Sequence, residues 1–340
     1  MKREQEVAMM VTTRRSSVGL ALLVDLGREF GVPVADSLRG TGLSEAQAHD
    51  LAGEIDAAQE LQVARTLLAT CDEPCLGLLA GARYNLTTYG SWGLGMATSA
   101  TVRDATQLAI RYLALTHSFC RMSLAEIDAT ACLHIDADDV PADLRVFCTE
   151  RSAAAAFMTA RDALTTLRLD RAEFDYPAPP DADRYDLFDA PIRFGADRTR
   201  LVFDRTLLDQ PMPRANVSTT RWYERQARDL LDRRSPHPTF TTRIRAYLLE
   251  HPVELPSATE TAADFGIGTR TLTRRLTAEG TTFRAVLDEV REQLAEELLL
   301  SGLTVEQTSQ RLGYAEPASF HHAFRRWKGI TPGSFARDRD

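Results

Sequence analysis

Three side chains near residue 270 have the types and the spacing to read DNA bases. Arg270, Thr273 and Arg274 fall within about one helical turn of one another. An arginine can form two hydrogen bonds with guanine, and a threonine can contact a thymine methyl group or a base edge. Arg275, at the next position, suits a phosphate. The pattern predicts DNA contact, although a solvated basic face on a packed helix would present the same residues.

A second stretch, closer to the C-terminus, carries a comparable set of side chains. The early exposed positions of its helix would be held by Ala318, Ser319, His321 and His322, and phosphates would be contacted by Arg325, Arg326 and Lys328. Adjacent histidines on a helix point in different directions, so His321 and His322 are poorly spaced to bind one metal ion. We therefore expect a second DNA-contacting segment and no metal site.

The elements that must position both sets are two helix-turn-helix units. Residues 261–276 and 307–324 each contain a short amphipathic segment, then a glycine, Gly266 or Gly313, and then a second segment. Each second segment has an apolar pair four residues apart, which would anchor it to a core. Between the units, residues 281–302 read as one long helix, which would hold the two recognition helices about 34 Å apart, the length of one DNA turn. The sequence predicts an all-α domain over residues 239–337, in which Ser257 and Glu260 form a capping box.

The preceding region alternates between helical and strand patterns and predicts an α+β domain over residues 17–213. Residues 101–120 form an amphipathic pattern that starts with a capping box of Thr101 and Asp104. Residues 121–138 alternate apolar and polar side chains around a turn, which is typical of a hairpin, and residues 190–213 predict two more strands. Residues 214–238 are bounded by prolines and predict a partly helical linker.

Composition places the chain among soluble proteins. Its 340 residues are 44% hydrophobic and 26% charged, with a net charge of −8. That charge argues weakly against nucleic acid as a partner, but residues 239–340 are almost neutral and their basic residues are clustered. The first 17 residues read as a loose tail and not as a signal peptide, and no apolar run is long enough to span a membrane. We expect a cytoplasmic protein that does not bind membranes.

Five cysteines all lie in the N-terminal half: Cys71, Cys75, Cys120, Cys132 and Cys148. The favoured interpretation is buried free thiols in a reducing compartment, with a redox or metal sensor at Cys71 and Cys75 as the alternative. No histidine stands near that pair to complete a metal site.

Two parts of the chain resemble a known family. The stretch SGLTVEQTSQRLGYAEPASFHHAFRRWKGITPGSFARD, with LGY, SF, AF, RWKG and TP in order, resembles the DNA-binding domain of the arabinose-operon regulators, the AraC/XylS type. The stretches CLGLLAGARYNLTTYGSWGLGMATSATVRDATQLAIRYL and APIRFGADRTRLVFDRTLLDQPMP resemble the ligand-sensing domain of one branch of that family. The resemblance implies a transcription regulator that binds double-stranded DNA, contacts RNA polymerase, forms a homodimer and senses a small-molecule effector.

The effector site is located only loosely by the sequence. Residues that could line an apolar cavity are Tyr84, Tyr89, Trp92, Met96, His117, Phe119 and Phe147. A carboxylate could meet Arg83, Arg111 or Arg151. For each of these residues, an ordinary core or surface role is the favoured interpretation.

Two other classes of function were weighed. An enzyme would need a nucleophile, a base or a phosphate-binding loop, and no such motif occurs in the sequence. We therefore expect neither catalysis nor a cofactor. The alternative to DNA binding is a helical module that binds another protein, and salt dependence would separate the two because DNA binding weakens steeply with salt.

Overall fold

The computed structural model describes residues 14–234, 239–252, 255–314 and 316–337. The chain forms two compact units that divide between Ser235 and Pro236. The linker expected over 214–238 ends in residues 235–238, and the expected N-terminal tail begins in residues 1–13; both of these segments lie outside the described residues. No helix in the described ranges is long and apolar enough to cross a membrane.

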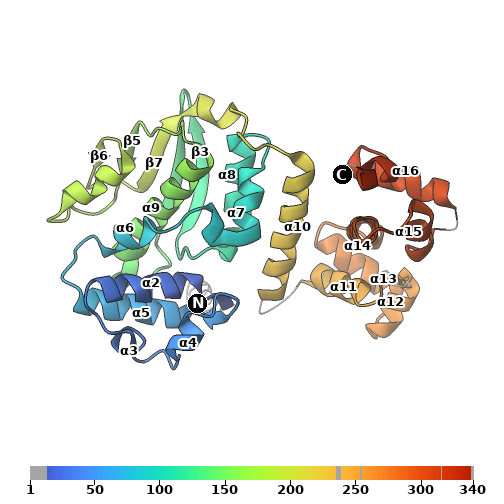
Figure 1. Ribbon diagram of the computed structural model, residues 1–340, viewed down its shortest axis with the longest axis horizontal. Helices are drawn as coiled ribbons and strands as arrows, with labels where there is room; N and C mark the ends of the chain where they lie inside the picture. The colour runs from blue at the N-terminus through green and yellow to red at the C-terminus, as the bar shows by residue number, and fades with distance from the viewer. Residues whose placement is uncertain (1–13, 235–238, 253–254, 315, 338–340) are drawn as a thin grey trace. The chain divides into compact units, whose positions relative to one another are not determined.

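The N-terminal unit is an α+β fold (Figure 1). Its α-helices are α2 (Val18–Glu29), α3 (Val34–Ser37), α4 (Glu45–Ala48), α5 (Ala57–Thr70), α6 (Leu76–Gly81), α7 (Gly90–Ala97), α8 (Val102–Arg111), α9 (Arg145–Ala163) and α10 (Val217–Arg234). Its strands are β1 (Arg14–Ser16), β2 (Glu54–Asp56), β3 (Arg121–Ile127), β4 (Thr130–Asp136), β5 (Arg171–Glu173), β6 (Ile192–Arg193) and β7 (Thr199–Asp204). Short 3₁₀ helices occur at Leu86–Tyr89, Leu113–Leu115, Ala142–Leu144, Ala182–Phe188 and Arg205–Asp209.

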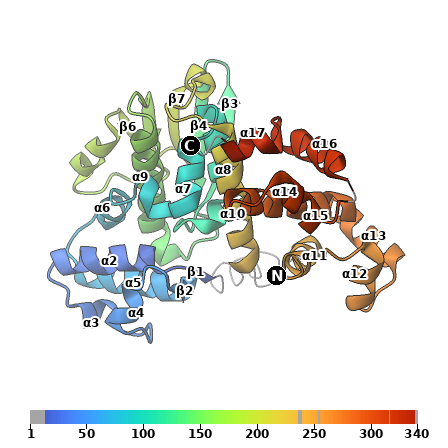
Figure 2. The same cartoon turned by 45° about the vertical axis from the view of Figure 1, so that its right-hand side comes forward.

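Five strands form one sheet in the order β3-β4-β7-β5-β6. The hairpin predicted over 121–138 is β3 and β4, paired antiparallel with Leu124 opposite Leu133. The long helix α9 packs against β4 and β7, while α2 and α5 lie together toward the N-terminal end of the unit (Figure 1). Figure 2 shows β1 and β2 beside those N-terminal helices. The predicted tail is therefore wrong at its end, because residues 14–16 form a strand.

The helix predicted over residues 101–120 is shorter than expected. Its capping box is confirmed, since the Thr101 hydroxyl accepts from the Asp104 backbone N–H, and the Asp104 side chain accepts from the Thr101 backbone. The helix α8 ends at Arg111, and a 3₁₀ turn at Leu113–Leu115 leads to the hairpin. This early end allows residues 113–118 to curve around a cavity described below.

The segment expected to be a linker differs from that expectation, because most of it forms the helix α10. This helix packs along α7 within the N-terminal unit. The Thr220 hydroxyl donates to the Thr98 carbonyl at 2.5 Å, and Arg111 pairs with Glu224 at 2.5 Å. On its inner face, Ala227 is buried in one cluster with Trp92 of α7. Most of the segment between the prolines thus belongs to the N-terminal unit.

The C-terminal unit is all helix, as predicted. Its helices are α11 (Phe240–Leu249), α12 (Ala258–Asp264), α13 (Thr269–Ala278), α14 (Phe283–Leu300), α15 (Val305–Arg311), α16 (Pro317–Lys328) and α17 (Pro332–Arg337). The capping box of Ser257 and Glu260 is present at the start of α12. One apolar core joins the elements: Val290 and Leu294 of α14 share it with the anchoring pairs of α13 and α16.

Candidate DNA-contacting surface and ligand pocket

The first helix-turn-helix consists of α12, the turn at Gly266 and α13. Gly266 adopts a φ of 64°, a left-handed conformation that favours glycine, and the Ile267 backbone N–H closes the turn on the Ala262 carbonyl at 2.9 Å. Leu272 and Leu276 are fully buried and fix the rotation of α13 about its axis. This local packing decides which side chains of α13 remain exposed.

The opposite face of α13 carries the side chains expected to read bases. Arg270, Thr273 and Arg274 are all exposed. The Thr273 hydroxyl donates to the Thr269 carbonyl at 3.0 Å. Within the described ranges, neither Arg270 nor Arg274 forms an ion pair. Both guanidinium groups are therefore available for an anionic or polar partner.

Arg275 is exposed but partly engaged. Its guanidinium carbon lies 5.3 Å from the centre of the Phe240 ring, which is a cation–π geometry. The ring belongs to α11, so this side chain bends toward α11 and away from the Arg270 side of the helix. Phosphate contact by Arg275 stays a prediction.

The second helix-turn-helix consists of α15, the turn at Gly313 and α16. Gly313 adopts a φ of 75°, and Phe320 and Phe324 are fully buried. The N-cap residue Glu316 makes no side-chain hydrogen bond to the helix, while Pro317 begins the first turn. The two units thus share one construction, an anchored second helix after a left-handed glycine.

The exposed face of α16 holds most of the predicted set. The exposed side chains are Ala318, Ser319, His321, His322, Arg325 and Arg326. Arg326 forms an ion pair of 3.0 Å with Asp288 of α14, although its side chain remains 58% exposed. The face is therefore accessible, with one of its cations directed toward α14.

Lys328 does not belong to this surface, and the prediction that it contacts a phosphate is corrected. Its side chain is 4% exposed, and its Nζ lies 3.2 Å from Glu292 and in contact with Glu296. The reason is helical geometry, because Lys328 follows Phe320 and Phe324 at intervals of four and shares their buried stripe. A signal for this pairing was present in the sequence, since Asp288, Glu292 and Glu296 recur at the same interval on α14.

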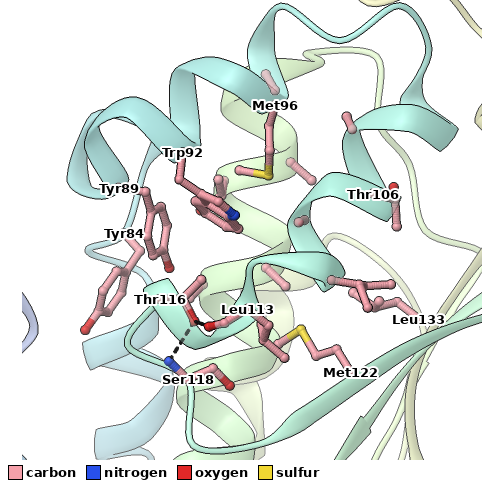
Figure 3. A pocket seen from close by; sticks show the side chains of 18 of the residues that line it. Tyr84, Tyr89, Trp92, Met96, Thr106, Leu113, Thr116, Ser118, Met122 and Leu133 are labelled. Atoms are coloured by element: carbon pink, nitrogen blue, oxygen red, sulfur yellow. Dashed lines mark hydrogen bonds between the residues drawn. The ribbon is translucent and has the colours of Figure 1, made fainter. Parts of the chain in front are cut away.

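The N-terminal unit contains a pocket of about 150 Å³ beside α9. Figure 3 shows Trp92 and Met96 entering it from α7, Thr106 from α8, and Met122 and Leu133 from the hairpin. Much of the α9 wall is made of small side chains: Ser152, Ala155, Ala156, Ala160 and Ala163. The cavity exists because α9 presents few side chains long enough to fill it.

The structure brings together five of the seven residues proposed to line a cavity. Tyr84, Tyr89, Trp92, Met96 and His117 line the pocket. Phe119 and Phe147 do not; both are buried in the main core of the unit. Large apolar side chains occur in core and pocket alike, so composition could not separate these two from the others.

The aromatic residues form a continuous row along one side of the pocket. Ring centres are 4.7 Å apart for Tyr89 and Trp92, and 5.7 Å apart for Tyr84 and Tyr89. The His117 ring lies 5.5 Å from Tyr84. Burial lowers the pKa of His117 to about 3, so this imidazole is neutral at ordinary pH.

A buried ion cluster lies at one end of that row. The Glu60 carboxylate of α5 forms two ion pairs. One oxygen pairs with Arg15 of β1 at 3.3 Å, and the other pairs with Arg151 of α9. Arg151 also donates to the His117 carbonyl, and it lines the pocket. Of the arginines proposed to meet a carboxylate, only Arg151 reaches the pocket; Arg83 pairs with Glu29, and Arg111 pairs with Glu224. Arg15 and Glu60 were missed by the sequence analysis.

The comparisons with known proteins agree with this architecture. Residues 31–212 match the model of the arabinose-binding domain of AraC transcription regulators, and residues 261–338 match a helix-turn-helix domain. The chain belongs to the AraC/XylS family. It is a DNA-binding transcriptional regulator.

Related proteins cover nearly the whole chain. An HTH-type transcriptional regulator of Mycobacterium tuberculosis is 34% identical over 93% of this chain and 94% of its own length. The ornithine utilization regulator of Pseudomonas aeruginosa is 28% identical over 92% of this chain and 93% of its own. The crystal structure of the regulator CdpR from Pseudomonas aeruginosa shares 29% identity with a TM-score of 0.46, covering 81% of this chain and 90% of that one.

Proposed function

We propose that this regulator recognises a specific DNA sequence through α13 and α16, and that a small molecule in the N-terminal pocket controls how it does so. The observation that carries the first part is the shared construction of the two units. In each, an apolar pair is fully buried and fixes a second helix whose opposite face is exposed and polar or basic. Arg270, Thr273 and Arg274 would contact bases, and Arg275, Arg325 and Arg326 would contact phosphates.

The second part rests on the packing of α10 against α7, the helix that contributes Trp92 and Met96 to the pocket. Trp92 and Met96 line the pocket from α7 and share an apolar cluster with Ala227 of α10. A ligand that moves α7 would therefore move α10, whose last residue, Arg234, lies just before the C-terminal unit in the chain. For control to follow, the effector must bind one arrangement more tightly than another. We further propose that the protein acts in the cytoplasm as a homodimer that contacts RNA polymerase.

The test of DNA recognition begins with a binding site selected from random DNA. Arg274→Ala should weaken binding by about 1 to 3 kcal/mol and relax the preference at one base position. Arg65→Ala is the matched control, because it removes an arginine that pairs with Asp143 in the other unit. Unchanged affinity and unchanged base preference for Arg274→Ala would remove this residue from the reading surface. Affinity for DNA that did not fall steeply with salt would favour the protein-interaction alternative.

The test of control compares the full chain with residues 239–340. This segment has its own apolar core and can be made separately. It should bind the same DNA site more weakly and without any response to an effector, because it lacks the pocket and the proposed dimer. An effector response retained by the segment would place the sensor in the C-terminal unit and contradict the proposal.

A further inference from the structure

The charges of the ion cluster at the end of the pocket do not sum to zero. Arg15 and Arg151 both pair with Glu60, and the three side chains are between 0% and 5% exposed. Within the described residues, Glu60 is the one carboxylate that pairs with either arginine. The two guanidinium groups hold the pKa of Glu60 below its usual value although burial opposes this, so the acid is ionised. Two cations and one anion leave a net charge of +1.

The neighbouring titratable groups do not supply the missing negative charge. His117 is neutral because burial lowers its pKa to about 3. Tyr84 is neutral because burial raises its pKa to about 12, although Arg151 opposes the shift. An uncompensated charge in the protein interior is unfavourable, and the usual remedy is an anionic partner with hydrogen bonds. Arg151 is the member of the cluster that lines the pocket.

The pocket changes from polar to apolar along α9. Arg151 and Ser152 stand at one end, and Ser152 shares a hydrogen bond of 3.0 Å with Ser118. Further along the helix the wall consists mainly of alanines, and Met96 lines the pocket away from Ser118 (Figure 3). Figure 3 shows Ser118 and Thr116 at one end of the cavity, with Leu113 and Met122 beside them, and Met96 at the opposite end. A molecule that fits must have one polar end and an apolar body.

Several buried polar atoms of the lining have no hydrogen-bond partner among the described residues: Tyr84 Oη, Trp92 Nε1, His117 Nδ1 and Thr159 Oγ1. Among these residues, Trp92 is 7% exposed. Its ring projects into the cavity (Figure 3). Buried indole N–H groups usually have a partner, so an acceptor atom belongs in this space.

We propose that the pocket binds a small amphiphilic monocarboxylate, with its charged group at Arg151 and its apolar body against the alanine face of α9. This inference rests on the proposed function, since it names the chemical class of the effector. The volume of about 150 Å³ matches that of cavities that accept a benzene-sized molecule in other proteins. A cation is disfavoured by the surplus positive charge. A free sugar is disfavoured because its several hydroxyl groups would meet methyl and thioether groups.

The experiment compares probes of equal shape and different charge on the full chain. Hexanoate and phenylacetate are each tested against the corresponding primary amide and primary amine by calorimetry and thermal shift at pH 7.5. The carboxylates should bind about tenfold or more tightly than the amides, because charge-assisted hydrogen bonds are stronger, and the amines should not bind. Amides that bind as well as carboxylates, or amines that bind better, would overturn the proposed class.

Two variants locate the site. Arg151→Gln should abolish the preference for carboxylate over amide, while Arg65→Gln, which removes a surface arginine, should retain it. Because Arg151→Gln removes a buried ion pair and could prevent folding, Ala156→Leu provides a second test on the apolar wall. This variant should exclude phenylacetate and leave the thermal unfolding of the free protein cooperative. Unchanged phenylacetate binding by Ala156→Leu would place the ligand elsewhere.

DNA binding by the same samples separates this inference from the proposed function. If no probe binds while the full chain still binds its DNA site, the ligand class is wrong and DNA recognition stands. A wider screen of neutral compounds uses a variant in which Trp222 and Trp327 are replaced by phenylalanine, so that, of the tryptophans, only Trp92 fluoresces. If such compounds bind and quench Trp92, the pocket is a site for an effector of another chemical class and the carboxylate proposal is wrong. If DNA binding itself fails, the proposed function is wrong whatever the probes do.

Discussion

Replacing Lys328 with methionine should destabilise the C-terminal unit by about 3 kcal/mol. The Lys328 ammonium lies 3.2 Å from Glu292 and contacts Glu296, and the side chains of Lys328 and Glu296 are 4% and 5% exposed. Removing one partner of a buried ion pair costs about 3–5 kcal/mol, and the lower end applies because Glu292 is 19% exposed. Arg326→Met should cost about 0–1 kcal/mol, because that side chain is 58% exposed.

The assay is urea unfolding of the full chain followed through Trp327. With Trp92 and Trp222 replaced by phenylalanine, Trp327 is the remaining tryptophan and reports on the C-terminal unit alone. For a urea m-value of about 1–2 kcal/mol per molar, the loss lowers the unfolding midpoint by about 1.5–3 M. Replacing Glu292 and Glu296 with glutamine in the Lys328→Met background should recover most of this loss, because the two carboxylates that Lys328 neutralises are then absent.

DNA binding supplies the result that would refute this reasoning. A lysine that contacts one phosphate contributes about 0.9 to the slope of log K against log salt. If Lys328→Met leaves the unfolding midpoint unchanged and lowers that slope by about one, Lys328 reaches DNA and is not a structural cation. We expect the reverse, an unchanged slope and a lower midpoint.

Two further predictions concern the N-terminal unit. Burial raises the pKa of Glu150 to about 7 from 4.5, so the stability that the protonated acid confers is complete below pH 4.5 and is lost as the pH rises through 7. The free energy of unfolding, measured at pH 5, 6, 7 and 8, should therefore fall by up to about 1.4 kcal/mol per pH unit in this window. The Glu150→Gln variant should not show this fall. Parallel pH profiles of the two proteins would contradict the prediction. A fragment ending at Pro213 should melt about 5–10 °C below one ending at Arg234, because it lacks the helix that covers Trp92; equal melting temperatures would show that α10 does not stabilise the unit.

Local features of the fold could be predicted from the sequence because they depend on neighbouring residues. The capping boxes at Thr101 and Ser257 and the left-handed turns at Gly266 and Gly313 each need only a few adjacent positions. The hairpin at 121–138 follows from strict alternation. Such patterns identify both helix-turn-helix units, and with them the exposed faces that would contact DNA.

The pocket could be predicted only in part because it is built from distant segments. Arg15, Glu60 and Arg151 are separated by 45 and 91 residues, and nothing local indicates that they meet. The pairing of β1 with β2, which brings Arg15 to Glu60, is equally remote in sequence. Phe119 and Phe147 were misplaced for the same reason, since the tertiary fold decides whether an apolar ring lines the core or a cavity.

The alanines of α9 also bear on how regulators of this kind could acquire new specificities. One wall of the pocket is the helix α9, which also packs against α6 and the sheet. Ala155, Ala156 and Ala160 each present a single methyl group to the cavity, and each could be enlarged by one substitution. A short series of such changes would reshape the cavity stepwise while the ion cluster and the DNA-contacting helices stay as they are. The feature makes α9 a natural starting point for building sensors of chosen small molecules.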